Sequence, residues 1–260
     1  MRTAWKVIVG ILAALLILLL VAEFGLRAYM ANEIRSSMAA EAPDSVAVQA
    51  DDMGVSFGPS PLTLGLARGV VPHVTLDTPS TLAIEGDSFA GNPATTIQVD
   101  NLRVDNGRQV AEQLTLNTQL PDDFVRVMLQ QQLSDALSQA GDGRASFLDG
   151  IITVSDVTSN PETGTFTIGF SGGAAGLELR PEMRDGNLTF QAEATELFGF
   201  AMPQSVTQGI SSALETGVEE SVTGQLEVRD FTVGAGNLDV TLSGNDVDMA
   251  QLSRSAPATS

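Results

Sequence analysis

The chain has 260 residues, no cysteine and a formal net charge of −19. The lack of cysteine excludes disulfides and thiolate metal sites. From Ser36 to the end, nine arginines and no lysine stand against thirty acidic residues, so charge disfavours both DNA and RNA as partners.

An apolar segment near the N-terminus is the first predicted element. Residues 7–22 are all apolar or glycine, and Glu23 ends the run. Counted through residue 26, the segment is long enough to cross about 30 Å of hydrocarbon as a tilted helix. A cleaved signal peptide is the alternative, but it needs small residues in a set pattern just after the apolar core, and these are missing. We therefore expect a transmembrane anchor over residues 7–26.

The orientation of this anchor depends on the segments on either side of it. Arg2 and Lys6 before the apolar run are matched in number by Arg27 and Arg35 after it, so the lysine and arginine bias is flat. A long domain after an anchor translocates largely regardless of its own charge. We expect a short cytoplasmic N-terminus over residues 1–6 and a single pass through the cell membrane. The main domain would then lie on the extracytoplasmic side, in the periplasm or cell wall.

Beyond residues 27–45, which are predicted as a juxtamembrane helix and linker, most segments alternate apolar and polar residues. This period of two is typical of half-buried antiparallel strands, and turn pairs such as Asn106-Gly107 separate the segments. We assign one domain to residues 46–250 and a disordered tail to residues 251–260. The predicted strand segments are 46–48, 74–76, 81–84, 97–99, 114–117, 151–154, 166–170, 177–179, 188–192, 226–228 and 238–242.

Two segments have a helical period instead. Residues 121–140 place apolar side chains at helical spacing, with Asp122 and Asp123 in the first turn, where the helix dipole favours acids. Residues 203–222 repeat this pattern behind Pro203, which suits a first turn. The order of elements predicts an α+β fold, in which an elongated, twisted antiparallel sheet curls around two amphipathic helices.

Catalytic and metal-binding motifs are weak. Residues 169–173 fit Gly-x-Ser-x-Gly with Ser171 at its centre, but a nucleophile elbow needs a helix after the turn, and a strand is predicted there. His73, the only histidine, has no identifiable orienting partner. Carboxylate pairs such as Asp51-Asp52 lack the spacing of a calcium loop. We expect no catalytic residue, no metal site and no cofactor, with an esterase that uses Ser171 as a less favoured alternative.

Large apolar side chains gather in the second half of the chain, where they predict either an ordinary core or a groove for acyl chains. Arg180 and Arg184 are candidate headgroup ligands, because guanidinium groups bind phosphate bidentately. Pairing with Glu178, Glu182 or Asp185 is the simpler expectation for them. The candidate lipid-binding residues are Val125, Met128, Leu129, Phe147, Phe166, Ile168, Phe170, Phe190, Phe198, Phe200, Ile210 and Leu214.

The assembled pattern resembles the LmeA-like phospholipid-binding proteins of actinobacterial cell envelopes. The resemblance rests on the apolar N-terminus, Val46-Ala47-Val48, a strand segment around residues 64–69, residues 177–188, the helix after Pro203, residues 226–233 and residues 237–240. It implies a tubular lipid-binding architecture, an elongated curled sheet around helices with an apolar channel. It also implies phospholipid binding outside the cytoplasmic membrane in support of envelope assembly, with no catalytic motif to carry over.

Together these observations predict a membrane-anchored phospholipid-binding protein that carries or presents lipid and does not catalyse a reaction. The alternative is a structural scaffold of the envelope, with a closed core and an acidic face that binds partners. The strong acidity bears on this choice, since a free carrier would be repelled by an anionic membrane and an anchored one would not.

Overall fold

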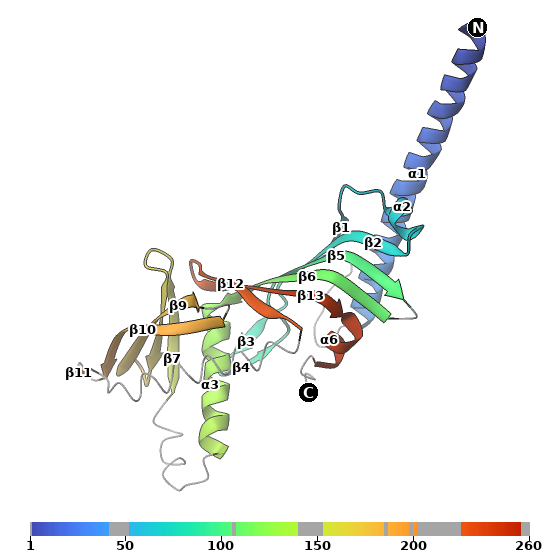
Figure 1. Cartoon of the computed structure of the whole chain (residues 1–260). Helices are drawn as coiled ribbons and strands as arrows, with labels where there is room; N and C mark the ends of the chain where they lie inside the picture. The colour runs from blue at the N-terminus through green and yellow to red at the C-terminus, as the bar shows by residue number, and fades with distance from the viewer. Residues whose placement is uncertain are drawn as a thin grey trace.

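Antiparallel strands dominate the computed structural model, and four helices are described beside them (Figure 1). The structure describes residues 2–41, 52–105, 108–139, 153–184, 187–197, 200–201 and 225–255. Side chains are described for residues 18–37, 52–104, 108–134, 153–184, 188–192 and 225–252. The predicted α+β class with antiparallel pairing is confirmed.

The first sheet has six strands, built around two long neighbours that form a hairpin. These are β5 (Thr95–Asp105) and β6 (Arg108–Pro121), whose alternating sequences bury one face of each strand. The order across this sheet is β1 (Gly54–Phe57), β2 (Val70–Thr78), β5, β6, β13 (Asn237–Asp248) and β12 (Glu227–Val233). The last two strands come from the end of the chain, so the sheet joins both halves of the sequence.

The second sheet is a five-stranded meander, in which each strand pairs with the next along the chain. Its strands are β7 (Val154–Asn160), β8 (Thr165–Phe170), β9 (Ala175–Arg184), β10 (Asn187–Leu197) and β11 (Phe200–Ala201). A separate hairpin consists of β3 (Ala83–Glu85) and β4 (Ser88–Ala90). The strands therefore divide over two sheets and a hairpin, where one continuous sheet was predicted. Strand β12 contacts β9 and β10 and so links the two sheets.

The predicted helix over residues 121–140 is confirmed as α3 (Asp122–Gln139). Two short helices were not predicted, α2 (Leu62–Leu66) and α6 (Met249–Ser255). The strand expected around residues 64–69 is wrong, because residues 64–66 lie in α2. Helix α6 includes residues 251–255 of the predicted tail, and Leu252 packs on the six-stranded sheet. The second predicted helix, over residues 203–222, lies outside the described residues.

Helix α1 (Arg2–Glu41) extends well beyond the sheets at its N-terminal end (Figure 1). The predicted anchor over residues 7–26 lies within α1, whose side chains are described from Leu18 onward. Among the described residues, no helix is both long enough and apolar enough to cross a membrane.

The described side chains form two apolar clusters. The small cluster lies between the six-stranded sheet and α6, around Leu114 and Val247, both fully buried. The large cluster lies between the five-stranded sheet, α3 and the β12–β13 edge of the six-stranded sheet. Its buried members are Val154, Val157, Phe166, Ile168, Leu177, Leu179, Leu188, Phe190, Val228, Val233 and Leu238.

Candidate functional site

The large apolar cluster brings together half of the residues predicted to contact lipid. Phe166, Ile168 and Phe190 are 2 %, 1 % and 7 % exposed and belong to its buried part. The partly buried Val125, Leu129 and Phe170 pack against them. Because strand residues two apart share a face, the alternating sequence of β8 directs Phe166, Ile168 and Phe170 to the same side.

Three aromatic rings lie at the centre of the large cluster. The ring centroids of Phe166 and Phe190 are 5.9 Å apart with perpendicular planes, a favourable edge-to-face arrangement. Phe231 of β12 completes the group at 6.5 Å from Phe166 and 5.9 Å from Phe190. Phe231 was not among the predicted contact residues, and the strand predicted over residues 226–228 ended before it, whereas β12 extends to Val233. Only the pairing of β12 with β13 and its contact with the second sheet bring it here.

Polar contacts at two points along α3 fix it against β7. Near its start, Asp122 accepts hydrogen bonds from the Ser159 backbone N–H (2.9 Å) and from the Ser159 hydroxyl (2.5 Å). Two turns later, Gln130 Oε1 accepts a buried hydrogen bond from the Val154 backbone N–H at 2.7 Å. Between these points Val125 and Leu129 face the large cluster. The apolar side of α3 is therefore held against the sheet by contacts on either side of it.

The opposite side of α3 faces the β3–β4 hairpin. Phe124 is buried and packs edge-to-face on Phe89, with ring centroids 4.8 Å apart. Arg126 donates to the Asp87 carboxylate (2.7 Å) and to the Gly86 carbonyl oxygen (2.6 Å). Helix α3 thus has two covered sides, where the sequence analysis assigned it one apolar stripe.

The remaining predicted contact residues are not placed in the cluster. Met128 is half-buried on α3 and is not a member of the large cluster. Phe200 lies in β11, and its side chain is outside the described set. Phe147, Phe198, Ile210 and Leu214 lie outside the described residues. Their contact with lipid stays a prediction.

The candidate headgroup ligands lie on the other face of the second sheet. In β9 the buried Leu177 and Leu179 point to the large cluster, so Arg180 and Arg184, at even positions, point away from it. Arg184 binds Glu182 through Nε (2.9 Å) and Nη2 (2.6 Å), as the simpler expectation predicted. Arg180 Nη1 donates to the carbonyl oxygen of Thr163 at 2.6 Å. A phosphate held by these arginines would be separated from the large cluster by the sheet.

The Gly-x-Ser-x-Gly segment forms a hairpin turn between β8 and β9. Ser171, Gly172 and Gly173 have φ angles of 53°, 70° and 87°, and the Gly173 backbone N–H donates to the Phe170 carbonyl oxygen at 3.1 Å. An antiparallel strand comes after this turn, so the strand–turn–helix geometry of a nucleophile elbow is missing.

His73 has partners that its sequence context did not indicate. The register of β2 and β5 sets it opposite Asp100, whose carboxylate oxygen lies 2.5 Å from His73 Nδ1, and Thr75 Oγ1 lies 3.0 Å from Nε2. The prediction that His73 lacks an orienting partner is therefore wrong, because strand register joins residues that are distant in sequence. Ser171 lies in a turn of the other sheet, so His73 and Asp100 do not form a catalytic group with the Gly-x-Ser-x-Gly segment.

Polar residues also line a depression of about 460 Å³ at one end of the first sheet. Thr78, Thr96, Asn117, Gln119 and Asp239 are among its lining residues. Hydroxyl and amide groups do not match an acyl chain, so this depression is not the candidate lipid site. Within the described ranges, no three histidine or acidic side chains are placed to hold a metal ion together.

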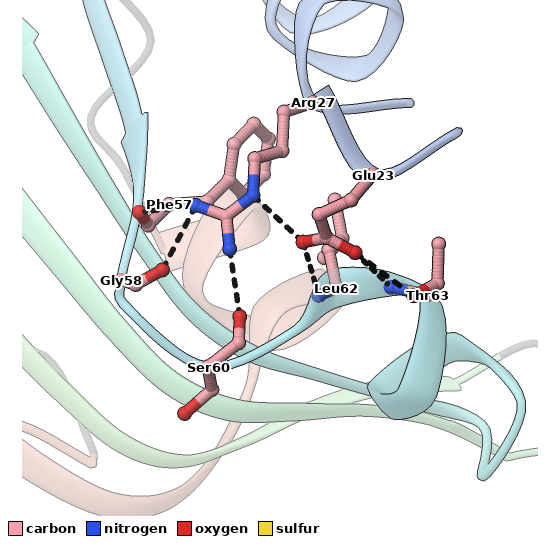
Figure 2. Close-up of polar contacts among 7 residues, drawn as sticks. All are labelled: Glu23, Arg27, Phe57, Gly58, Ser60, Leu62 and Thr63. Atoms are coloured by element: carbon pink, nitrogen blue, oxygen red, sulfur yellow. Dashed lines mark hydrogen bonds and ion pairs between the residues drawn. The ribbon is translucent and has the colours of Figure 1, made fainter. Parts of the chain in front are cut away.

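Polar contacts join α1 to residues 57–63 of the domain (Figure 2). Glu23 is 8 % exposed and accepts hydrogen bonds from the backbone N–H groups of Leu62 (2.6 Å) and Thr63 (3.0 Å) and from the Thr63 hydroxyl (2.8 Å). Arg27, one turn later, donates to Glu23 Oε1 at 2.7 Å. Its other nitrogens donate to the carbonyl oxygens of Phe57 (3.0 Å), Gly58 (2.9 Å) and Ser60 (2.8 Å).

The Glu23–Arg27 contact supplies hydrogen-bond partners to the carboxylate that ends the apolar run. Burial raises the pKa of Glu23, but the hydrogen bonds from Thr63, Leu62 and Arg27 lower it by more. The pKa of Glu23 is therefore about 2 instead of about 4.5. Glu23 is therefore ionised at neutral pH. Glu23 packs as part of the folded domain, and the apolar run before it ends at residue 22.

Three comparisons with known proteins were informative to different degrees, and one of them matched a protein family. Searches of curated proteins and of solved structures gave no match. The model of the LmeA-like phospholipid-binding family matches residues 21–252, nearly the whole chain. That stretch includes both sheets, α3 and the large apolar cluster, so the chain belongs to the LmeA-like phospholipid-binding family.

Proposed function

We propose that this protein is a membrane-anchored, extracytoplasmic phospholipid-binding protein that carries or presents lipid for cell-envelope assembly without catalysing a reaction. Membership of a phospholipid-binding family supports the class of ligand. The observation that carries the proposal is the large apolar cluster, in which six side chains expected to contact lipid come together from α3, β8 and β10.

An acyl chain would enter this cluster between α3 and the five-stranded sheet. Each methylene group that leaves water contributes about 0.8 kcal/mol, so a short length of chain suffices for stable binding. Leu129 and Leu133 of α3 and Phe170 of β8 are only partly buried, and they lie at the boundary of the cluster. In this proposal the two sheets and α3 form the elongated, tubular arrangement that the family resemblance implies.

Exposed apolar side chains on α1 support the membrane anchor. Leu18, Leu19, Leu20 and Val21 are between 46 % and 68 % exposed, and they continue the apolar run that begins at residue 7. Apolar side chains on all sides of a helix are favourable in lipid and unfavourable in water. With residues 7–22 in the cell membrane and the domain outside, the anchor offsets the repulsion between an acidic domain and anionic lipid.

Photocrosslinking of the full-length chain in lipid nanodiscs tests lipid binding by the cluster. The nanodiscs contain a trace of phospholipid with a diazirine near the end of one acyl chain, and mass spectrometry maps the adducts. We expect adducts on α3 and on β8–β10, and Leu129→Gln should reduce them at least fivefold. Val104→Gln, at an exposed apolar position in β5 of the first sheet, is the matched control. Adducts on α1 report insertion of the anchor in the same sample.

Three outcomes would contradict parts of this proposal. Adducts confined to α1 would mean that the core is closed and would favour the scaffold with an acidic partner-binding face. Absence of adducts on α1 would reject the anchor. Phospholipid hydrolysis that is lost in Ser171→Ala would reject the non-catalytic role.

A further inference from the structure

Helix α2 presents apolar side chains to solvent beside α1. Leu64 is 50 % exposed and Leu66 is 38 % exposed, whereas Leu62 is buried at 1 %. Gly65 fixes the orientation of α2, because a Cβ atom at this position would lie 2.6 Å from the Pro72 ring and 2.7 Å from the Val70 carbonyl oxygen. With Gly65 pressed against β2, Leu64 and Leu66 cannot turn inward.

The Glu23–Arg27 contact sets the level of α2 relative to the apolar run. Glu23 accepts hydrogen bonds from the first residues of α2, Leu62 and Thr63. Helix α2 therefore begins beside the residue at which the apolar run ends. A bilayer that surrounds residues 7–22 has its surface at this level, and the exposed Phe24 (69 %) marks the same position on α1.

The charge around α2 differs from that of the chain as a whole. Residues 53–76 contain no aspartate or glutamate, although the chain carries a net charge of −19. Arg68, two residues after the end of α2, is exposed. Among the described residues its side chain has no hydrogen-bond or ion-pair partner. An acid-free segment that carries an unpaired guanidinium group is complementary to anionic headgroups.

We propose that α2 is a second membrane contact, in which Leu64 and Leu66 rest in the bilayer surface beside α1 and Arg68 binds anionic headgroups. This inference rests on the proposed anchor. A helix alone leaves a domain free to tilt and rotate about it, whereas a helix plus a second contact fixes one orientation. Together, α1 and α2 would hold the first sheet in one fixed orientation relative to the membrane.

Single-cysteine labelling of the full-length protein tests this contact directly, because the natural chain has no cysteine. The variants Leu64→Cys, Met183→Cys and Leu20→Cys each carry an environment-sensitive NBD fluorophore. The proteins are placed in nanodiscs of phosphatidylcholine with about 30 % phosphatidylglycerol, an anionic lipid, with doxyl-labelled lipids as quenchers at two depths. Met183 is a matched exposed apolar position on the other sheet, and Leu20 reports insertion of the anchor.

We expect the label at position 64 to be quenched at least threefold more than that at position 183, with the shallow quencher most effective. Position 20 should respond best to the deep quencher. Removal of phosphatidylglycerol should lower quenching at position 64 at least twofold, and Arg68→Gln should abolish this dependence. Equal quenching at positions 64 and 183, with position 20 quenched, would overturn the contact while the anchor and lipid binding stand. Absence of quenching at position 20 would overturn the anchor and the contact together.

Discussion

At the scale of single residues, Glu23 shows how one carboxylate joins a helix to a domain. Ion pairs on the surface contribute little, but a carboxylate that also accepts two backbone N–H groups satisfies donors that have no other partner at the start of α2. Arg27 serves the reverse purpose, since it donates to three carbonyl oxygens of the loop before α2. The pair therefore organises residues 57–63 as well as α1.

The low pKa of Glu23 predicts a specific dependence of stability on pH. Its pKa is about 2 in the folded protein and about 4.5 as the ordinary value, so its stabilising effect is complete above pH 4.5. This effect is lost as the pH falls from 4.5 towards 2, because protonation favours the unfolded chain. We expect Glu23→Gln to lower the free energy of unfolding by about 1–3 kcal/mol at pH 7 and to flatten its pH dependence in this range.

Denaturant unfolding of the full-length chain in detergent, at pH values between 2.5 and 7, measures both effects. Glu33→Gln is the matched control, because Glu33 is exposed on the same helix. Equal unfolding midpoints for Glu23→Gln and Glu33→Gln at neutral pH would show that the buried carboxylate does not stabilise the domain.

At the scale of elements, a buried amide is one of the groups that hold α3 against β7. Gln130 is 9 % exposed and is the acceptor for the Val154 N–H at the start of β7. We expect Gln130→Met to leave this donor without a partner and to lower the free energy of unfolding by about 1–3 kcal/mol. Hydrogen exchange of the Val154 amide should accelerate in parallel. Gln132→Met, an exposed change on the same helix, should leave both the free energy and the exchange rate near those of the natural protein.

The comparison of sequence with structure separates local from non-local information at this scale. The period of α3 and the alternation of β8, β9 and β13 are local, and each element lies where its pattern predicted. The division into two sheets depends on strand pairing between distant segments, such as β6 with β13, which a single sequence does not encode visibly.

At the candidate site too, some features follow from local sequence and others depend on strand pairing. The alternation of odd and even positions along β9 can be seen in the sequence. It would have placed Arg180 and Arg184 on the face of the sheet opposite to that of Leu177 and Leu179. The partner of His73 and the place of Phe231 were not available, because both depend on strand pairing. The five-residue α2 is too short for its periodicity to be recognised, although Gly65 and Leu62 explain its packing once the fold is known.

At the scale of the whole molecule, the first sheet separates the large apolar cluster from the end that carries α2. Strand β6 pairs near its start with Arg103, close to Val70 and α2, and near its end Leu120 packs against the large cluster. The ten residue steps from Val110 to Leu120 span about 34 Å at the usual rise of a strand. A lipid bound in the cluster of an anchored protein would thus be held a strand's length away from the α2 end.

The same architecture makes the second half of α1 part of the domain. Besides Glu23 and Arg27, Ala31 is buried at 8 % and Arg35 donates to the Met53 carbonyl oxygen at 2.9 Å. A domain boundary at residue 46 would remove all four contacts. We therefore expect a chain of residues 36–260 to unfold at a clearly lower denaturant concentration than a chain of residues 23–260, which keeps them and lacks the apolar run.

A double variant and a hydrogen-exchange measurement test this prediction further. In the 23–260 chain, the double change Glu23→Gln with Arg27→Gln should remove most of the difference, since these two residues make the most hydrogen bonds between the described part of α1 and the domain. Hydrogen exchange should locate the loss in β1 and in residues 57–63, which α1 contacts, and spare the five-stranded sheet. Equal stability of the two chains would mean that α1 merely lies on the domain, and a membrane-bound helix would then transmit no fixed orientation to the first sheet.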